Sequence, residues 1–208
     1  MKSDVWPMVH AERAALIEDL AALADRDWQT PSLCERWTVH DVAAHLVANA
    51  RETRLGFIVG LFGVRFDFDR LNEQGVERER GAEPRETLER LRRVASRRST
   101  APAPLDSRLV EEIVHGEDIR RPLGLSRAYP MDAVVRALRV QTRTPAAFGG
   151  AGHLTARFAF QATDADLRLG EGPEVRGTVH ALLLAASGRV VALDELDGPG
   201  AADLATML

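Results

Sequence analysis

The spacing of apolar residues changes near residue 141, and this change divides the chain into two parts of different fold class. Before it, apolar positions recur every three or four residues, the period of a helix with one buried face. After it, Leu154, Ala156, Phe158 and Phe160 occupy alternate positions, the period of a half-buried strand. Residues 142–153 contain a proline and three glycines, which is typical of a linker. We therefore predict a helical domain over residues 1–141 and a small α+β domain over residues 153–208.

Five helices are expected in the first domain. The second should begin after Thr38, because a hydroxyl followed three residues later by Asp41 is a variant of the capping box. The loop before it is anchored by two tryptophans, and residues 62–84 form a long polar connection. The five predicted helices span residues 3–25, 39–61, 86–98, 106–119 and 131–140. In the second domain we expect strands at 154–161, 166–169, 174–177 and 189–193, and helices at 178–186 and 201–207.

Composition excludes several classes of partner. Lys and Arg number 27 against 31 Asp and Glu, giving a net charge of -4, so nothing favours nucleic acid or anionic lipid. The N-terminal residues lack the apolar stretch of a signal peptide, and no apolar run is long enough to span a bilayer. The single cysteine, Cys34, cannot form an internal disulfide, which fits a reducing compartment. We expect a cytoplasmic protein with no membrane or nucleic-acid partner, whose partner is a small molecule or another protein.

Three side chains are candidates for a divalent-metal site inside the helical domain. Glu111 and His115 are four residues apart, so they lie on one face of a helix, about one turn from each other. His45 falls on the apolar stripe of the second helix, where a buried imidazole needs a partner. A set of two histidines and one carboxylate would leave a tetrahedral Zn²⁺ one open position, as in catalytic zinc sites. The same ligand types also suit nonhaem Fe²⁺ and Ni²⁺.

The residue pattern leaves alternatives open. A lone inward histidine is more often a hydrogen-bonded core residue than a ligand. Glu112 competes with Glu111, because three residues from His115 also face one direction, although its apolar neighbours favour a solvated Glu112 at the edge of the bundle. Asp118 could orient the His115 ring or lie in solvent. Cys34 is expected to be structural, and His40 to be exposed near a helix start.

Two sequence runs resemble a known family. They are Pro31-Ser32-Leu33-Cys34-Glu35-Arg36-Trp37-Thr38-Val39-His40-Asp41-Val42-Ala43-Ala44-His45-Leu46 and Glu111-Glu112-Ile113-Val114-His115-Gly116-Glu117-Asp118-Ile119-Arg120-Arg121-Pro122-Leu123-Gly124. In order and separation they are similar to the mycothiol-dependent maleylpyruvate isomerase family of actinobacteria, within the DinB-like superfamily of metal-binding four-helix bundles. The tail around Pro173-Glu174-Val175-Arg176-Gly177 resembles that family's C-terminal domain of sterol-carrier-like type.

This resemblance implies a fold, a ligand set and a chemistry. The fold is a DinB-like four-helix bundle followed by a small sterol-carrier-like α+β domain. The metal ligands are His45, Glu111 and His115, which selects Glu111 over Glu112 by analogy. The implied cofactors are zinc and mycothiol, a low-molecular-weight thiol that a metal would hold as a thiolate. The implied activity is that of a transferase or isomerase, in which this thiolate attacks an electrophilic small molecule.

Two other functional hypotheses remain. One is a noncatalytic metal- or ligand-binding protein that has kept the ligands and lost the reaction. The other is an Fe²⁺ oxygenase, which has suitable ligands but is expected on a β-sandwich rather than on a helical scaffold. The pattern does not identify the physiological substrate.

Overall fold

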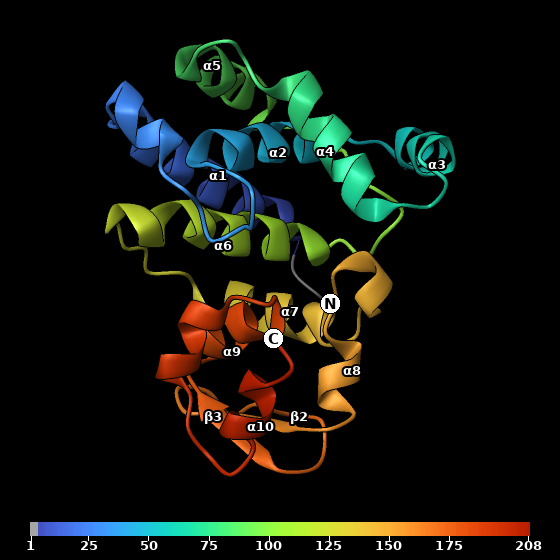
Figure 1. Ribbon diagram of the computed structural model, residues 1–208, viewed down its shortest axis with the longest axis vertical. Coiled ribbons are helices and arrows are strands. Elements are labelled where there is room, and N and C mark those ends of the chain that lie inside the picture. The colour runs from blue at the N-terminus through green and yellow to red at the C-terminus, as the bar shows by residue number, and fades with distance from the viewer. Residues whose placement is uncertain (1–3) are drawn as a thin grey trace. The chain divides into compact units, whose positions relative to one another are not determined.

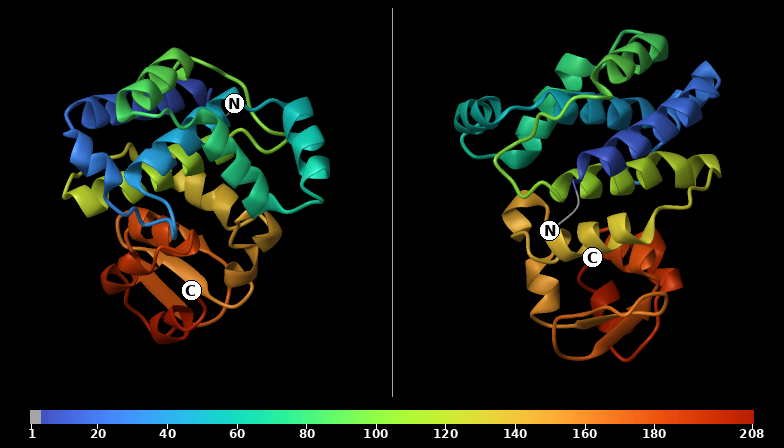
Figure 2. Two further views of the ribbon diagram at one scale, coloured as in Figure 1. Left: turned by 45° about the horizontal axis from the view of Figure 1, so that its top comes forward. Right: turned by 180° about the vertical axis from the view of Figure 1, so that it is seen from behind.

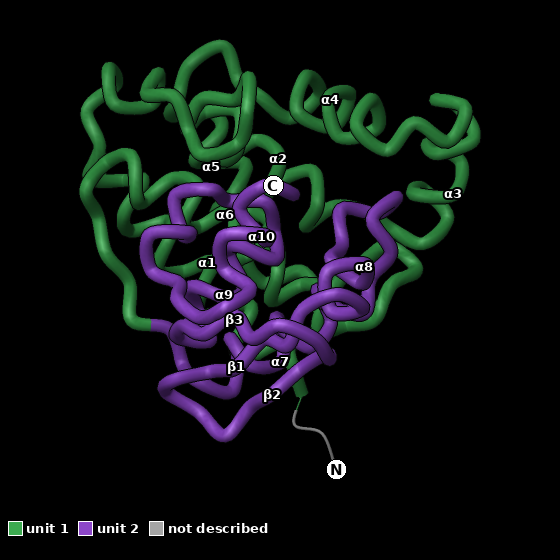
Figure 3. The backbone as a smooth tube through the Cα atoms, turned by 60° about the horizontal axis from the view of Figure 1, so that its bottom comes forward, with its two compact units in different colours: residues 1–128 green, residues 129–208 purple. Residues whose placement is uncertain are grey.

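The computed structural model describes residues 4–208, and the chain divides into two compact units, residues 1–128 and 129–208 (Figure 3). The expected fold class is confirmed, because a helical unit precedes a small α+β unit with a three-stranded sheet (Figure 1). The predicted start of the first helix at Ser3 lies outside the described residues. Within residues 4–208, no helix combines the length and apolar character needed to cross a membrane.

Six α-helices make up the described part of the first unit. Four of them, α1, α2, α5 and α6, pack as a bundle around one apolar core, while α3 and α4 form an excursion between α2 and α5 (Figures 1 and 2). Their bounds are α1 (Trp6–Ala21), α2 (Val39–Arg51), α3 (Arg54–Gly63), α4 (Phe68–Glu79), α5 (Pro84–Val94) and α6 (Ser107–Arg120). Short 3-10 turns lie at η1 (Asp25–Gln29) and η2 (Arg121–Leu123).

The bundle core is built from the apolar stripe of each of the four helices. Buried members include Leu16 and Leu20 on α1, Leu46 on α2, Leu91 on α5 and Ile119 on α6. Their spacing within each helix follows the helical period on which the sequence analysis relied. The predicted capping box is present at the start of α2, where the side chain of Thr38 accepts from the backbone N–H of Asp41.

The second predicted helix, residues 39–61, is in fact two helices. α2 ends at Arg51, and Thr53 caps α3 by accepting a hydrogen bond from the N–H of Gly56. A threonine at this position offers the backbone an alternative to continuing the helix. No proline or glycine marks the break in the sequence. The apolar spacing continues across it and therefore predicted one helix instead of two.

The polar connection predicted at residues 62–84 contains a helix, α4, that packs on α2. Asp67 caps it by accepting from the N–H of Arg70. Gly75 lies where a Cβ atom would come within 3.2 Å of the Ala48 side chain, so the two helices approach closely. The glycines and charged residues that suggested a loop instead permit close packing on one face and solvation on the other.

The second unit contains a sheet of three strands in the order β2-β1-β3, with β1 antiparallel to β2 and parallel to β3. α9 packs against β1 and β3 (Figure 2). The bounds are α7 (Met131–Gln141), η3 (Ala146–Phe148), α8 (Gly152–Thr155), β1 (Ala159–Ala162), β2 (Arg168–Leu169), β3 (Glu174–Gly177), α9 (Val179–Ala186), η4 (Val190–Glu195) and α10 (Ala201–Ala205).

Two predicted strands of this unit are wrong in part or in full. Residues 154–161 begin as the helix α8, and only their end forms β1, where Phe158 and Phe160 are buried as the alternation predicted. Residues 189–193 were expected to form a strand but lie mostly in the 3-10 helix η4, with Val190 and Val191 exposed. β-branched residues favour a strand only where a neighbouring strand is available to pair with them.

The helix α7, expected in the first domain, packs against α9 in the second unit.

Candidate metal centre

The three predicted ligands meet between α2 and α6. His45 lies on α2, and Glu111 and His115 lie one turn apart on α6. Glu111 Oε2 is 3.5 Å from His45 Nε2 and 3.4 Å from His115 Nε2. One ligand atom from each of the three side chains lies within 4.8 Å of the others. Helix packing thus brings together residues separated by about a third of the chain.

These separations match the edges of a metal coordination shell. Bonds of about 2.0–2.1 Å to a tetrahedral zinc ion place neighbouring nitrogen and oxygen ligands about 3.3–3.4 Å apart. A hydrogen bond between the same atoms would draw them to about 2.7–3.2 Å. The observed 3.4 and 3.5 Å lie closer to the first range. The residues present therefore fit a divalent ion in ligand type and in spacing.

Asn49, to which the sequence analysis gave no role, contacts two of the three candidate ligands. It follows His45 by one helical turn, and its Nδ2 lies 2.9 Å from His45 Nε2 and 2.6 Å from Glu111 Oε2. An amide N–H can only donate, so His45 Nε2 carries a lone pair on this side. A metal ion would use the same lone pair, so it would take the place of the Asn49 hydrogen bond to His45. The position of Asn49 on the apolar stripe of α2 was the one signal that could have marked it.

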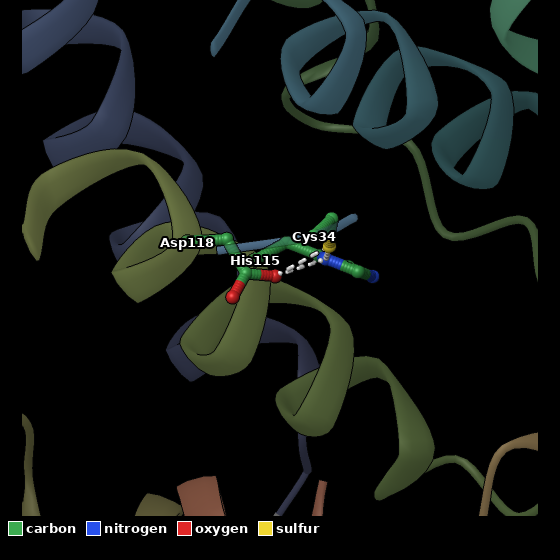
Figure 4. Close-up of side chains that lie close together, drawn as sticks. All are labelled: Cys34, His115 and Asp118. Atoms are coloured by element: carbon green, nitrogen blue, oxygen red, sulfur yellow. Dashed lines mark hydrogen bonds and ion pairs between the residues drawn. The ribbon is translucent and has the colours of Figure 1, made fainter. Parts of the chain in front are cut away.

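The other nitrogen of His115 faces a second polar cluster (Figure 4). His115 Nδ1 is 2.8 Å from Asp118 Oδ2, and the Cys34 thiol donates to the same carboxylate oxygen at 3.0 Å. Asp118 is fully buried, so it is not solvated. A carboxylate at this place fixes the imidazole orientation and raises its basicity as a ligand. The solvent-exposed alternative for Asp118 is thereby excluded.

Cys34 reaches this cluster through the loop that precedes α2. The backbone N–H of Leu33 donates to the carbonyl of Asp118 at 3.2 Å, which ties the loop to α6. Within the loop, Ser32 Oγ donates to the Trp37 carbonyl at 2.8 Å. Trp37 in turn packs on His45, with ring centroids 4.9 Å apart. The structural role expected of Cys34 is therefore a hydrogen bond: its thiol donates to the carboxylate that contacts His115.

Cys34, His115 and Asp118 are also close enough to be considered as metal ligands. Their separations of 2.8 and 3.0 Å are those of hydrogen bonds between a donor and a shared acceptor. The Sγ to Nδ1 distance is 3.7 Å. The distances thus identify this cluster as hydrogen-bonded support for His115, while the longer spacings around Glu111 suit an ion.

Glu112 differs from the expectation of a solvated residue at the edge of the bundle. It is only 3% exposed, and its carboxylate accepts from Arg13 Nε of α1 at 2.7 Å. The Glu111 side chain is the more exposed of the two, at 24%. The apolar neighbours on α6 did not reveal Glu112 as buried, because its partner lies 99 residues away.

His40 was expected to be exposed and is instead buried, with Nε2 2.7 Å from Thr87 Oγ1 of α5. Burial and the nearby Arg80 guanidinium lower its pKa to about 4. It packs edge-on against Trp28 and lies outside the ligand cluster. Proximity to a helix start predicted exposure, but here the first turn of α2 is covered by α5.

The pKa values of the two neighbouring glutamates are shifted in opposite directions. Burial raises the pKa of Glu112, and the Arg13 guanidinium offsets this only in part. Burial would also raise the pKa of Glu111, but its contacts with His115 and His45 outweigh it and hold the pKa well below the ordinary value. Burial lowers the pKa of His45. For His115 the effect of burial is outweighed by Asp118, Cys34 and Glu111, which raise its pKa well above 6.5.

Comparisons with known proteins give a consistent picture. The family model described as the mycothiol maleylpyruvate isomerase N-terminal domain matches residues 9–141, a range that extends through α7. No curated protein matches the chain. The crystal structure of the mycothiol-dependent maleylpyruvate isomerase is similar in fold, with a TM-score of 0.66 at 13% identity over 94% of this chain and 92% of that one. A histidine-to-alanine mutant of that enzyme gives the same TM-score and coverage at 14% identity. Because the family model covers more than half of the sequence, the chain belongs to the mycothiol maleylpyruvate isomerase family.

Proposed function

We propose that His45, Glu111 and His115 hold one divalent ion, zinc, and that the protein is a mycothiol-dependent transferase or isomerase acting on an electrophilic small molecule. The observation that carries the proposal is the set of 3.4 and 3.5 Å separations around Glu111 Oε2, which suit a metal better than a hydrogen bond. Membership of the family supports the thiol, because mycothiol is part of the family's description.

A divalent ion bound by three protein groups would keep a coordinated thiol deprotonated near neutral pH, where a free thiol is mostly protonated. The chain's own residues would do the rest. Asp118 holds the His115 ring so that Nε2 faces Glu111, and the Asn49 amide donates to Glu111 Oε2. Packing on Trp37 and His115 fixes the His45 ring, whose Nδ1 has no hydrogen-bond partner among the described residues.

The two candidate ligands on α6 are more exposed than the one on α2. The side chains of His115 and Glu111 are 16% and 24% exposed, whereas that of His45 is 6% exposed. A thiol and a second small molecule can therefore approach Glu111 and His115 while His45 stays covered. Partial shielding from water favours chemistry of an anionic sulfur, because it limits competing solvation.

The first test is metal content. Dialysed protein should contain about one divalent ion per chain by elemental analysis, and His45→Ala should lose it. His153→Ala, which removes an exposed histidine of the second unit, is the matched control and should retain it. Absence of metal from the unmodified protein, with His45→Ala equally stable, would contradict the proposal.

The second test separates an enzyme from a binding protein. Mycothiol added to Co²⁺-substituted protein should change the visible absorption spectrum, and the zinc protein with mycothiol should turn over an electrophilic alkene. His45→Ala should do neither. Metal retention without any spectral response to the thiol would identify a noncatalytic metal-binding protein of the same fold.

A further inference from the structure

Three arginines are buried in the described part of the first unit, and one of them differs from the other two. Arg13, Arg108 and Arg120 are each at most 4% exposed. Arg13 Nε lies 2.7 Å from Glu112 Oε1, and Arg120 Nε lies 2.7 Å from Asp19 Oδ2. For Arg108 the nearest ion-pair contact runs from Nη2 to Glu111 Oε1 at 3.8 Å, beyond hydrogen-bond distance. Its Nε and Nη1 are buried without a hydrogen-bond partner among the described residues.

This arrangement is unfavourable unless something else binds there. A guanidinium presents five N–H donors, and a buried donor without an acceptor loses its hydration with no compensation. Neither nearby carboxylate is hydrogen-bonded to Arg108: Glu112 Oε1 accepts from Arg13, and Glu111 Oε1 lies 3.8 Å from Arg108 Nη2. The Glu111 Oε2 atom is directed toward the two histidines and Asn49. Arg108 thus remains a buried cation with unused hydrogen-bonding capacity.

Arg108 also lies beside the candidate metal centre. Arg108, Glu111 and His115 follow each other on α6 at steps of three and four residues, so they share one face of the helix. Glu111 connects the two sites: Oε1 is the atom nearer Arg108, and Oε2 lies near the histidines. Because Arg108 Nη2 lies 3.8 Å from the Glu111 carboxylate, the guanidinium borders the candidate metal centre.

We propose that Arg108 binds a carboxylate group of the electrophilic substrate and so selects anionic substrates for this site. The proposal rests on the proposed function in one respect, since it places that substrate beside the metal centre. A carboxylate is favoured over other anions because its two oxygens match the planar fork of a guanidinium. The low exposure of Arg108 strengthens such a charge-assisted bond, because little water competes for the donors.

The test uses full-length protein loaded with zinc, without thiol, titrated with succinate and with its uncharged analogue succinamide by calorimetry. Succinate should bind and succinamide should not. Arg108→Gln should weaken succinate binding about 10- to 100-fold, which corresponds to the usual strength of hydrogen bonds to charged groups. Arg108→Lys, which keeps the charge but not the fork, should give an intermediate affinity. Arg85→Gln, at an exposed arginine of α5, is the matched control and should leave succinate binding unchanged.

The outcomes separate this inference from the proposed function. Equal affinity of Arg108→Gln and unmodified protein for succinate, or no preference for succinate over succinamide in the unmodified protein, would overturn the role of Arg108. Either result would leave metal content and thiol binding as they are. Loss of succinate binding in Arg108→Gln, in a protein that showed no response to mycothiol, would instead support Arg108 and contradict the thiol chemistry. Should Arg108→Gln not fold, the Arg108→Lys affinity still decides: equal affinity of Arg108→Lys and unmodified protein for succinate would overturn the role of the guanidinium fork.

Discussion

Two faces of α6 meet the bundle in different ways, and the neighbouring residues Glu111 and Glu112 mark them. On one face, Glu112 Oε1 lies 2.7 Å from Arg13 Nε, and the two side chains form a buried ion pair. On the other face, Glu111 Oε2 lies 3.4–3.5 Å from two imidazole nitrogens, the spacing of neighbouring ligands of one ion. The pKa of Glu112 is raised by burial, whereas that of Glu111 is held low by the histidines that face it. Distance to the partner, more than burial, thus distinguishes a structural carboxylate from a candidate ligand.

The largest expected difference between the faces is in stability. Glu112→Gln leaves the buried Arg13 guanidinium without its counter-charge, and breaking a buried pair in this way costs about 3–5 kcal/mol. We expect the free energy of unfolding, measured in urea, to fall by about 3 kcal/mol, because glutamine keeps one oxygen for Arg13. The folded fraction should still hold its metal. A Glu112→Gln protein of unchanged stability that has lost its metal would reverse the assignment of the two faces.

The second difference concerns metal affinity. Glu111→Gln should weaken zinc binding at least about tenfold, measured by competition with a chelator, because a neutral amide replaces the only anionic ligand. The cost to the stability of the metal-free protein should be smaller than that of Glu112→Gln, since Glu111 is partly exposed. Retention of full zinc affinity by Glu111→Gln would show that the ion, if any, binds elsewhere.

The smallest expected difference is in the pH dependence that His115 contributes to the Glu111 face. The pKa of His115 is raised in the folded protein by Asp118, Cys34 and Glu111, which outweigh burial. The folded state therefore holds its proton more tightly than the unfolded state. This contribution to stability is complete below the unfolded pKa of 6.5 and is lost as pH rises through the folded pKa.

Metal-free protein should accordingly lose at most about 1.4 kcal/mol per pH unit as pH rises above about 6.5. Asp118→Asn should flatten this slope, and Glu112→Gln should leave it in place. Zinc affinity should change in the opposite sense and increase with pH, because the ion displaces the proton from His115. A metal-free protein whose stability does not vary between pH 6 and 9 would contradict this account of His115.

The parts of the fold and site that rest on local spacing could be predicted from the sequence. The period of α1, α2 and α6 located the bundle, and the four-residue step placed Glu111 beside His115. The helix predicted at 178–186 and the strand predicted at 174–177 also match α9 (Val179–Ala186) and β3 (Glu174–Gly177). In each case the determining interaction lies within one or two helical turns or along a single strand.

The features that sequence reasoning missed depend on partners distant in the chain. His40 is covered by Thr87, and Glu112 by Arg13, so neither burial could be inferred from neighbouring residues. Cys34 has no adjacent His or Lys in the sequence and yet its Sγ lies 3.0 Å from Asp118 Oδ2. Residues 189–193 have the composition of a strand, but they lie mostly in the 3-10 helix η4 and do not join the sheet.

The candidate metal centre is complete only when the loop ahead of α2 and the bundle have folded. Glu111 and His115 can meet in an isolated helix, but His45 and the Cys34 support for Asp118 come from segments more than sixty residues earlier. Such long-range contacts form only once the chain has closed large loops, late in assembly. A nascent or unfolded chain would therefore offer an ion two ligands rather than three, and tight binding would appear together with the finished bundle. The affinity of the chain for zinc would then act as a readout of whether its first 120 residues have reached the native arrangement.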